Sequence, residues 1–425
     1  METDIVVVGA GPVGLCLARS LAGSGLRVVV IDQQGIDSIR TPEFDGREIA
    51  LTQQSVRIMQ ELDLWDRIDP SERSALRAAK VFNGASPGAM EIGHESGAQL
   101  GWLVPNHLIR QAAWDAVHDS ATCGDAVTLL TSDAVTGVQT GATGASITTA
   151  SGKTIAAQLI VAADSRFSVT RKLMGIPASL HDFGKSMLVC RMTHGEPHHH
   201  TAWEWFGHGQ TLALLPLNPE PSTHTHAHRS SVVLTLPGHE MARLAQLAPD
   251  AFSRNLERRF AGRLGSMQLA GTRHVYPLVA VYPERFVAQR FATVGDAAVG
   301  MHPVTAHGFN LGLSSVVALS QEIIAAKTHG LDIADAAVLR RYEARHRRAT
   351  KPLYLATRFI TQIYTNDTPP ARLARDLLLR AAARFTPFRR AVADSLSGHT
   401  PAFAHGGPAT THSRPHQQKT GGQRT

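Results

Sequence analysis

Three shortages limit what this sequence can be: it has few cysteines, few aromatic residues and no long hydrophobic run. Its three cysteines, Cys16, Cys123 and Cys190, are odd in number and far apart. This excludes a disulfide framework and the common metal-ligand spacings, so we expect buried thiols in a reducing cytoplasm. No stretch of about 18 uninterrupted apolar residues occurs, which argues against a membrane-spanning helix. The short apolar start at residues 5–8 follows acidic residues and breaks at Gly9, so we expect no export signal.

The length and composition are typical of a soluble globular protein. The chain has 425 residues, of which 43% are hydrophobic and 18% charged. A chain of this length exceeds what one hydrophobic core usually organises, so we expect two intertwined domains with appendages. No internal repeat is evident, which argues against a solenoid.

The charge is concentrated at one end of the chain. From residue 340 to the end there are 16 Lys and Arg but 4 Asp and Glu, a net charge of +12 in a chain whose total is +7. A nucleic-acid-binding protein would combine such a patch with stacking aromatic residues or a known reader fold, and neither occurs, so we expect no nucleic-acid partner. Two interpretations stay open: a solvated helical face, or a face that contacts anionic lipid.

The pattern of apolar residues predicts an α/β protein. The first 31 residues read as one βαβ unit, with a strand over 5–8, a glycine turn over 9–14, a helix over 15–22 and a strand over 28–31. Apolar and polar residues alternate in much of the region from 185 to 290, which predicts an antiparallel sheet and a second domain. We also expect helices over 55–65, over 109–118 and from 311 to about 395, and strands over 127–130 and 159–163. The composition beyond residue 397 predicts a disordered tail.

Two loops of the second domain, over residues 195–200 and 218–229, are rich in His and Pro. Such tracts occur in metal sites and in surface loops. No carboxylate or cysteine completes an ordered ligand set, so we favour flexible surface loops and expect no metal.

The glycine turn carries the first functional signal. It reads Gly9-Ala10-Gly11-Pro12-Val13-Gly14, a GxGxxG pattern that follows a strand and opens a helix. Gly9 permits the tight turn, Gly11 lets a pyrophosphate approach the backbone, and Gly14 lets the helix pack on the sheet. Asp32, with Gln33 beside it, follows the next strand 23 residues after Gly9, close to the offset expected for a carboxylate on ribose hydroxyls.

A second motif lies some 280 residues later. Residues 291–298 contain Gly295-Asp296, and they are followed by His302-Pro303 and by the run Gly308-Phe309-Asn310-Leu311-Gly312. This segment resembles the Gly-Asp motif of the flavin-dependent aromatic hydroxylases. The resemblance implies that Asp296 binds the ribityl chain of FAD and that the turn carrying Pro303, Gly308, Phe309 and Asn310 opens a helix facing the flavin ring. A helix N-terminus aimed there stabilises an anionic reduced flavin.

Three further matches follow the same family. The run Asp164-Ser165-Arg166 resembles its Asp-Gly motif, with Ser165 in the glycine position, where a left-handed backbone would be costly for serine. In the runs over residues 45–51 and 106–110, the family places the arginines that contact FAD, here Arg47 and Arg110.

The five matches span residues 5 to 327 in the family's order. They resemble the p-hydroxybenzoate hydroxylase fold and, within it, the ubiquinone-biosynthesis flavin monooxygenases, the UbiH/UbiF family and its UbiM branch. The resemblance implies a Rossmann-type FAD-binding domain interleaved with an antiparallel β-sheet substrate domain, plus C-terminal helices. The expected division is 1–75, 105–180 and 275–330 for the FAD-binding domain, 76–104 and 181–274 for the sheet domain, 331–396 for the helices and 397–425 for the tail.

The resemblance also implies a mechanism. O2 is captured at the flavin C4a position, and the hydroperoxide transfers a hydroxyl to an electron-rich phenolic ring while the protein excludes water. The chain has no second GxGxxG, so NAD(P)H docks transiently or electrons come from a separate reductase. His307 takes a turn position that faces the flavin in the family, and its protonation would tune the ring's electric field; an ordinary loop histidine is the alternative.

Three functions stay open at this point. The first is hydroxylation of a polyprenylated ubiquinone precursor, a lipophilic phenol. The second is the same chemistry on a small aromatic acid or secondary metabolite, and the third a non-catalytic flavin-binding scaffold subunit. A wide apolar groove would favour the prenyl chain, and basic residues in the sheet domain would favour the acid. We expect a cytoplasmic enzyme that contacts the membrane peripherally through basic residues 371–391, with other ubiquinone-biosynthesis proteins as further partners.

Overall fold

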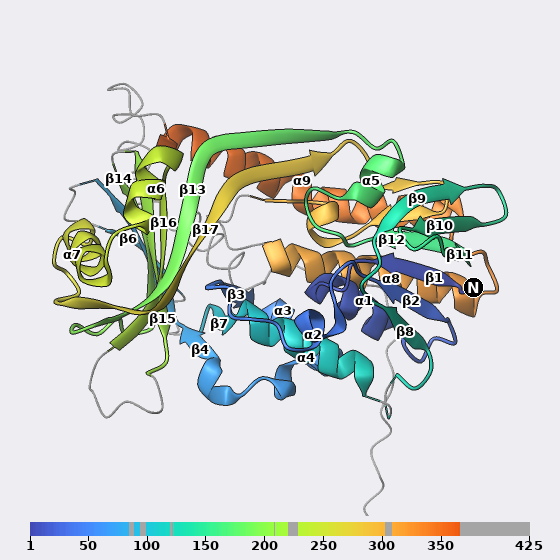
Figure 1. Ribbon diagram of the computed structural model, residues 1–425, viewed down its shortest axis with the longest axis horizontal. Coiled ribbons are helices and arrows are strands. Elements are labelled where there is room, and N and C mark those ends of the chain that lie inside the picture. Colours follow the sequence, from blue (N-terminus) through green and yellow to red (C-terminus); the bar gives the residue numbers. More distant parts are fainter. Residues whose placement is uncertain are drawn as a thin grey trace, which may run out of the picture.

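The computed structural model describes residues 1–84, 89–93, 99–119, 121, 123–207, 209–219, 228–301 and 308–365, the last eight without their side chains. Figure 1 shows two regions side by side, a Rossmann-like region on the right and a large sheet with its own helices on the left. Two long strands, β13 (Ala178–His194) and β17 (Met267–Pro283), run from one region to the other.

The Rossmann-like region is built on a six-stranded sheet with the order β18-β19-β12-β1-β2-β8. All neighbours pair in parallel except β18 and β19. The strands are β1 (Ile5–Val8), β2 (Val28–Ile31), β8 (Val127–Leu130), β12 (Leu159–Ala162), β18 (Val287–Ala288) and β19 (Phe291–Thr293). Strands buried on both faces read as continuous apolar runs, which is why β1 is Ile-Val-Val-Val.

Each face of this sheet has its own cover. Ile5 and Val7 of β1 join the core formed with the helices, and Val6 and Val8 join a second core under a small antiparallel sheet. The helices are α1 (Pro12–Leu21), α2 (Ile36–Arg40), α3 (Gln53–Glu61), α4 (Asn106–His118), α8 (Gly308–Thr328) and α9 (Ala336–Thr365), and α5 (Val169–Leu173) follows β12. The small sheet has the order β11-β10-β9, from β9 (Val135–Thr140), β10 (Ala145–Thr149) and β11 (Thr154–Ala157).

The second region is a seven-stranded sheet with the order β17-β13-β16-β15-β14-β5-β6. Its remaining strands are β5 (Ala78–Asn83), β6 (Ala89–Ile92), β14 (Thr201–Gly207), β15 (Gln210–Leu217) and β16 (His228–Pro237). Neighbours are antiparallel except β14 and β5. Helices α6 (Gly238–Ala245) and α7 (Pro249–Arg259) cover its outer face over a core that includes Leu188, Val232 and Phe252. A three-stranded sheet, β3 (Glu48–Thr52), β7 (Gly101–Pro105) and β4 (Ser74–Leu76), lies between the two regions.

The predicted α/β fold class is confirmed, including the βαβ unit, the antiparallel sheet and the helices near residues 55, 109 and 311. Helices α6 and α7 were not predicted, because the alternating pattern was extended across them. Their signals were Met241 and Leu244, then Phe252 and Leu256 at helical spacing, all four buried, with Pro249 at the start of α7. The division into domains stays a prediction, and residues 366–425, including the basic segment and the tail, lie outside the described residues.

Helix α8 is the only described helix that is long and apolar enough to cross a membrane. Its most apolar window has a mean hydropathy of 1.3, but 61% of that window is buried inside the protein. It packs against α1 and α9, as the core helix of a soluble protein does.

Candidate active site

The glycine turn has one crowded side and one open side. A Cβ on Gly9, whose φ is +111°, would lie 2.6 Å from the Ala163 carbonyl oxygen, and one on Gly14 would lie 2.0 Å from the Gly9 carbonyl oxygen. These two glycines let β1, β12 and α1 meet. A Cβ on Gly11 would meet nothing within 4 Å, and no side chain caps α1. The N-terminus of α1 therefore faces open space with its positive dipole end.

Asp32, just beyond β2, is fastened to this turn. Its Oδ2 accepts a hydrogen bond from the Ala10 N–H at 2.7 Å, and its Oδ1 accepts one from the Gln34 N–H at 2.8 Å. Each carboxylate oxygen keeps a second lone pair, so the half-buried Asp32 can still accept a ribose hydroxyl, with exposed Gln33 beside it.

The second motif meets the first at Val13. A Cβ on Gly295, whose φ is +60°, would lie 3.0 Å from Val13 Cγ1, and one on Gly312 of α8 would lie 2.7 Å from Val13 Cγ2. The Gly295 N–H donates to Ser315 Oγ at 3.0 Å. The structure thus brings together the two motifs that are some 280 residues apart in the sequence.

Asp296 lies on the short 3-10 turn between β19 and α8. Its Oδ2 accepts a hydrogen bond from Arg166 Nη2 at 2.9 Å, and its Oδ1 lies 3.8 Å from where a Cβ on Gly308 would lie. Arg166 also donates from Nη1 to the Val279 carbonyl at 2.9 Å. The sequence motif contained Arg166 but did not indicate that it pairs with Asp296.

In the Asp-Ser-Arg loop, Ser165 has a backbone conformation that is typical of glycine. Ser165 has φ +82°, a left-handed conformation that costs a residue with a Cβ about 1–2 kcal/mol. Asp164 holds the loop closed, because it accepts hydrogen bonds from the Ser168 hydroxyl and from the Thr170 N–H and hydroxyl. The Asp164 N–H nitrogen would lie 3.0 Å from a Cβ on Gly9, so this loop adjoins the glycine turn.

The two predicted arginines lie close enough to each other to interact electrostatically. Arg110 Nη2 is 3.5 Å from Gln34 Oε1, and burial lowers the pKa of the Arg110 guanidinium, partly offset by Asp45 and Asp32. Arg47 is bound to Asp45, with 3.0 Å from Nε to Oδ2. Arg47 is thus paired with Asp45, whereas Arg110 makes no ion pair among the described residues, and the contacts of both with FAD stay predictions.

Asn310 and Phe309 hold the first turn of α8 against its neighbours. Asn310 Oδ1 accepts from the Thr52 N–H at 3.1 Å, and its Nδ2 donates to the Ala50 carbonyl at 2.8 Å. This fastens the first turn of α8 to β3, and Phe309 packs on the main core.

A buried ion pair joins the two regions. Arg191 of β13 donates to Glu48 Oε1 from Nε at 2.9 Å and from Nη2 at 2.7 Å. Burial raises the pKa of the Glu48 carboxyl to about 7 against the attraction of Arg191. Glu48 Oε2 and the Nδ1 atom of His107 are buried without a hydrogen-bond partner. No sequence motif flagged Arg191, because its partner is 143 residues away.

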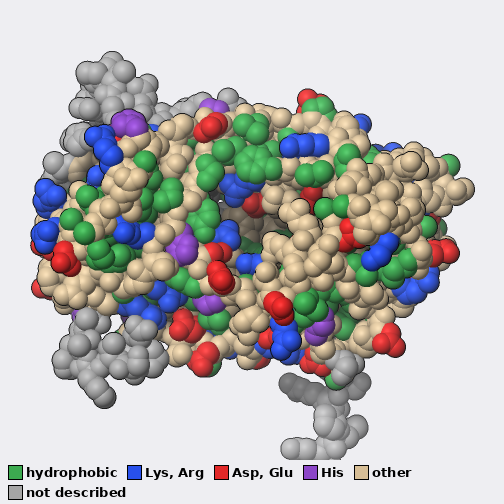
Figure 2. All heavy atoms as spheres, in the orientation of Figure 1, with side chains coloured by type: hydrophobic (Ala, Val, Ile, Leu, Met, Phe, Trp, Pro, Cys, Tyr) green, Lys and Arg blue, Asp and Glu red, His purple; other side chains and the backbone are tan. Residues whose placement is uncertain are grey.

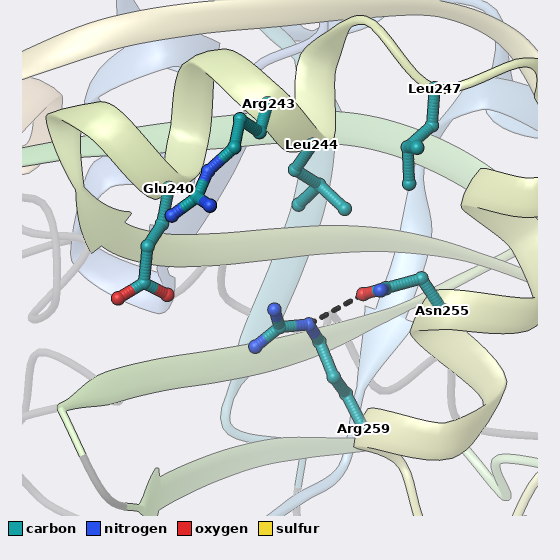
Figure 3. Close-up of a pocket in the computed structure, with 6 residues that line it drawn as sticks. All are labelled: Glu240, Arg243, Leu244, Leu247, Asn255 and Arg259. Atoms are coloured by element: carbon teal, nitrogen blue, oxygen red, sulfur yellow. Dashed lines mark hydrogen bonds between the residues drawn. The ribbon is translucent and has the colours of Figure 1, made fainter.

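Figure 2 shows the molecule hollowed near its middle, between the two regions, with charged side chains at the rim. A second depression, of about 240 Å³, lies on the outer side of the large sheet between α6 and α7 (Figure 3). There Arg259 donates to Asn255 Oδ1 at 2.7 Å. These helices cover the sheet face that points away from the glycine turn, so this depression is separate from the candidate site.

The histidine-rich region contains a cluster of rings. His194, His198 and His228 have ring centroids about 6 Å apart, and His198 is 8% exposed. The expectation of a flexible surface loop is therefore wrong for His198, because β13, β15 and β16 converge around it. His194 bonds the Glu196 carbonyl and Ser230, and His198 bonds the Leu217 carbonyl. Among the described residues, no group of three side chains could hold a metal ion.

The set around the glycine turn fits FAD. A pyrophosphate needs an open helix N-terminus, and the space beside Gly11, which a side chain would occupy, provides one. A ribose needs a carboxylate nearby, and Asp32 provides it. His302, Pro303 and His307 lie outside the described residues, so their roles, like the cofactor contacts of the other predicted residues, stay predictions.

Comparisons with known proteins agree with this site. A family model described as "FAD binding domain" matches residues 2–355. The chain is 42% identical over 404 residues to ubiquinone hydroxylase UbiM of Neisseria meningitidis, covering 94% of this chain and 85% of the relative. It is 34% identical over 388 residues to ubiquinone hydroxylase UbiL of Rhodospirillum rubrum, covering 91% and 87%.

Solved structures share the fold at low sequence identity. The p-nitrophenol 4-monooxygenase PnpA of Pseudomonas putida has a TM-score of 0.72 at 16% identity, covering 93% of this chain and 98% of its own. HpxO of Klebsiella pneumoniae, solved with FAD and uric acid, has a TM-score of 0.67 at 20% identity, covering 93% and 96%. The chain therefore belongs to the FAD-binding-domain family of flavin-dependent monooxygenases, in the group that contains the ubiquinone hydroxylases.

Proposed function

We propose that this monooxygenase hydroxylates the aromatic ring of a polyprenylated ubiquinone precursor. The observation that carries the proposal is an apolar face of the seven-stranded sheet, here called the flavin-facing face. A Cβ on Gly46, next to β3, would lie 2.8 Å from Val189 Cγ2, so this face is turned toward the FAD-binding region.

The flavin-facing face has an apolar middle. Strand register places Val81, Ala213, Val233 and Val189 in one row across β5, β15, β16 and β13. Val81, Ala213 and Val233 are only half-buried, although they lie on inner strands of a covered sheet. Apolar surface that is left open inside a protein is typical of a lipophilic ligand site.

The arginines of this face are already bonded. Arg191 is bound to Glu48, and Arg229 donates from Nε to the Asn218 carbonyl at 2.9 Å. A small aromatic acid would need a cation aimed at its carboxylate. The row is apolar, and Arg191 and Arg229 are already bonded to other groups. The face therefore favours the prenylated phenol over the acid.

When bound, FAD would supply the activation of O2, and the oxygen atom that enters the ring would come from that O2. The chain's own residues bind and orient. The α1 N-terminus holds the pyrophosphate, Asp32 the ribose and Asp296 the ribityl chain, and Asn310 fixes the first turn of α8. The apolar face holds the prenyl chain and keeps water from the reacting ring.

The remaining assignments belong to the same proposal. Electrons come from transiently docked NAD(P)H or from a separate reductase, and His307 tunes the field at the flavin. The enzyme is cytoplasmic, with peripheral membrane contact and other ubiquinone-biosynthesis proteins as partners.

Quinone-intermediate profiling in cells that lack this protein tests the function. We expect a prenylated precursor that lacks a ring hydroxyl to accumulate, and the parent gene to restore the quinone. A Gly11→Val variant should restore it poorly, because its FAD binding is weakened. Normal quinone levels without any accumulating precursor would contradict the proposal.

A further inference from the structure

One charged residue interrupts the apolar row of the flavin-facing face. Glu204 lies in the middle of β14, paired in register with Val81 on β5 and Ala213 on β15. Its neighbours Trp203 and Trp205 belong to the opposite face, where they pack with the outer core. Side chains alternate along a strand, so Glu204 is placed on the flavin-facing side.

Glu204 lies deep in the protein and still keeps accessible surface. It is half-buried by its own surface area, yet burial alone raises the pKa of its carboxyl to about 8. A side chain on the outer surface would not feel such desolvation. Its carboxyl is therefore desolvated by the surrounding protein, and the strand register places it next to Val81, Ala213 and, one strand further, Val233.

No described side chain forms a hydrogen bond or an ion pair with the Glu204 carboxyl. No charged residue shares its row on β5, β15 or β16. Arg191, three strands away on the same face, is bound to Glu48. A carboxyl held among Val and Ala without a partner destabilises the fold, which is typical of a group kept for a ligand.

We propose that Glu204 binds the ring hydroxyl of the phenolic substrate and thereby fixes which ring carbon is presented for hydroxylation. This inference rests on the proposed function, whose substrate is a prenylated phenol. The apolar row beside Glu204 holds the prenyl group, and the carboxyl is the polar contact that orients the ring, as a few placed polar groups do in apolar sites.

The hydrogen bond between Glu204 and the phenolic hydroxyl becomes stronger during the reaction. Above the raised pKa of Glu204, where the side chain is ionised, the phenolic O–H donates to a carboxylate oxygen. As the ring is attacked, the O–H bond breaks, the proton passes to the carboxylate, and the electron pair stays on the ring oxygen. The ring becomes more nucleophilic at the positions ortho and para to that oxygen. A carboxyl with a pKa near 8 accepts a phenolic proton better than an ordinary glutamate does.

A binding cycle on the FAD-loaded protein tests this assignment. The probes are 2-geranylphenol and its methyl ether, which lacks the hydroxyl proton, and binding is followed by the change in flavin absorbance. The variants are Glu204→Gln and, as a matched control, Glu196→Gln, whose carboxyl is exposed in the loop after β13. Glu204→Ala replaces Glu204→Gln if the latter does not retain FAD.

At pH 9, where the Glu204 carboxyl is ionised, we expect the parent and Glu196→Gln to bind the phenol about 10-fold to 100-fold more tightly than the ether, the range of one charge-assisted hydrogen bond. The Glu204 variant should bind both probes alike, and its hydroxylated products should change in ring position or give way to peroxide. Equal discrimination by the Glu204 variant and the parent would overturn the inference. If the parent discriminates through Glu204 but makes no hydroxylated product, the proposed function fails and the Glu204 contact stands.

Discussion

Replacement of Gly11 by valine separates binding of the cofactor from folding. Gly11 precedes α1 with φ −68° and ψ 172°, an extended backbone that valine adopts without strain. Its Cβ would meet nothing within 4 Å, so no protein atom has to move to make room for that atom. The loss of a good residue at the helix start costs about 1 kcal/mol, which a protein with a stability of about 5–15 kcal/mol tolerates.

The same side chain fills the space where a pyrophosphate would lie against α1. Loss of two charge-assisted hydrogen bonds, each worth about 1.5–3 kcal/mol, weakens FAD binding by about 10²-fold to 10⁴-fold. The assay is the flavin-to-protein ratio after purification, followed by titration of the apoprotein with FAD. Gly238→Val, at the start of α6 where a Cβ also meets nothing within 4 Å, is the matched control. FAD affinity in Gly11→Val equal to that of the parent would refute the placement of the pyrophosphate.

Further substitutions test other parts of the structure. Arg110→Ala should weaken FAD binding by about 10-fold to 100-fold without changing the unfolding midpoint, and an unchanged dissociation constant would remove Arg110 from the site. Ser165→Gly should raise the free energy of unfolding in urea by about 1 kcal/mol because it relieves the positive φ, whereas Ser165→Ala, which keeps a Cβ, should not; an equal gain in both would refute strain there. Arg191→Ala leaves Glu48 buried and unpaired and should lower that free energy by about 3–5 kcal/mol at pH 8; a loss under 1 kcal/mol would contradict the pairing. The Glu204 carboxyl has its pKa raised from 4.5 to about 8, so the folded state holds an extra proton between these values. Stability should therefore fall as the pH rises through this window, by at most about 1.4 kcal/mol per pH unit, and Glu204→Gln should lessen that slope; identical slopes in urea unfolding at several pH values would contradict it.

The parts of the site that the spacing of residues predicted without the family resemblance are local in the chain. Gly9, Gly11, Gly14 and Asp32 belong to one βαβ unit, and the approach of Gly14 to Gly9 and the hydrogen bond from Ala10 to Asp32 follow from short-range spacing. Ser165 could be recognised as a costly residue in a glycine position, but only the structure gives its φ of +82°. Asp164 and its three hydrogen bonds hold that conformation.

The parts that could not be predicted depend on long-range register. Arg166 pairs with Asp296 across 130 residues, and Arg191 pairs with Glu48 across 143. Neither pair has a spacing that a sequence pattern could reveal. The alternation around Glu204 predicted a strand, but only the order of β5, β14 and β15 shows that its neighbours are apolar. A one-residue shift in register would have placed Glu204 on the other face.

The fate of molecular oxygen tests the central claim most directly. Holoprotein with chemically reduced FAD is mixed with 2-geranylphenol under ¹⁸O₂, and the products are examined by mass spectrometry. The account predicts a ring-hydroxylated product that carries one ¹⁸O atom, with none when the gas is ¹⁶O₂ and the water is H₂¹⁸O. Peroxide without ring product, or a product whose new oxygen comes from water, would contradict the assignment as a ring monooxygenase of a prenylated phenol.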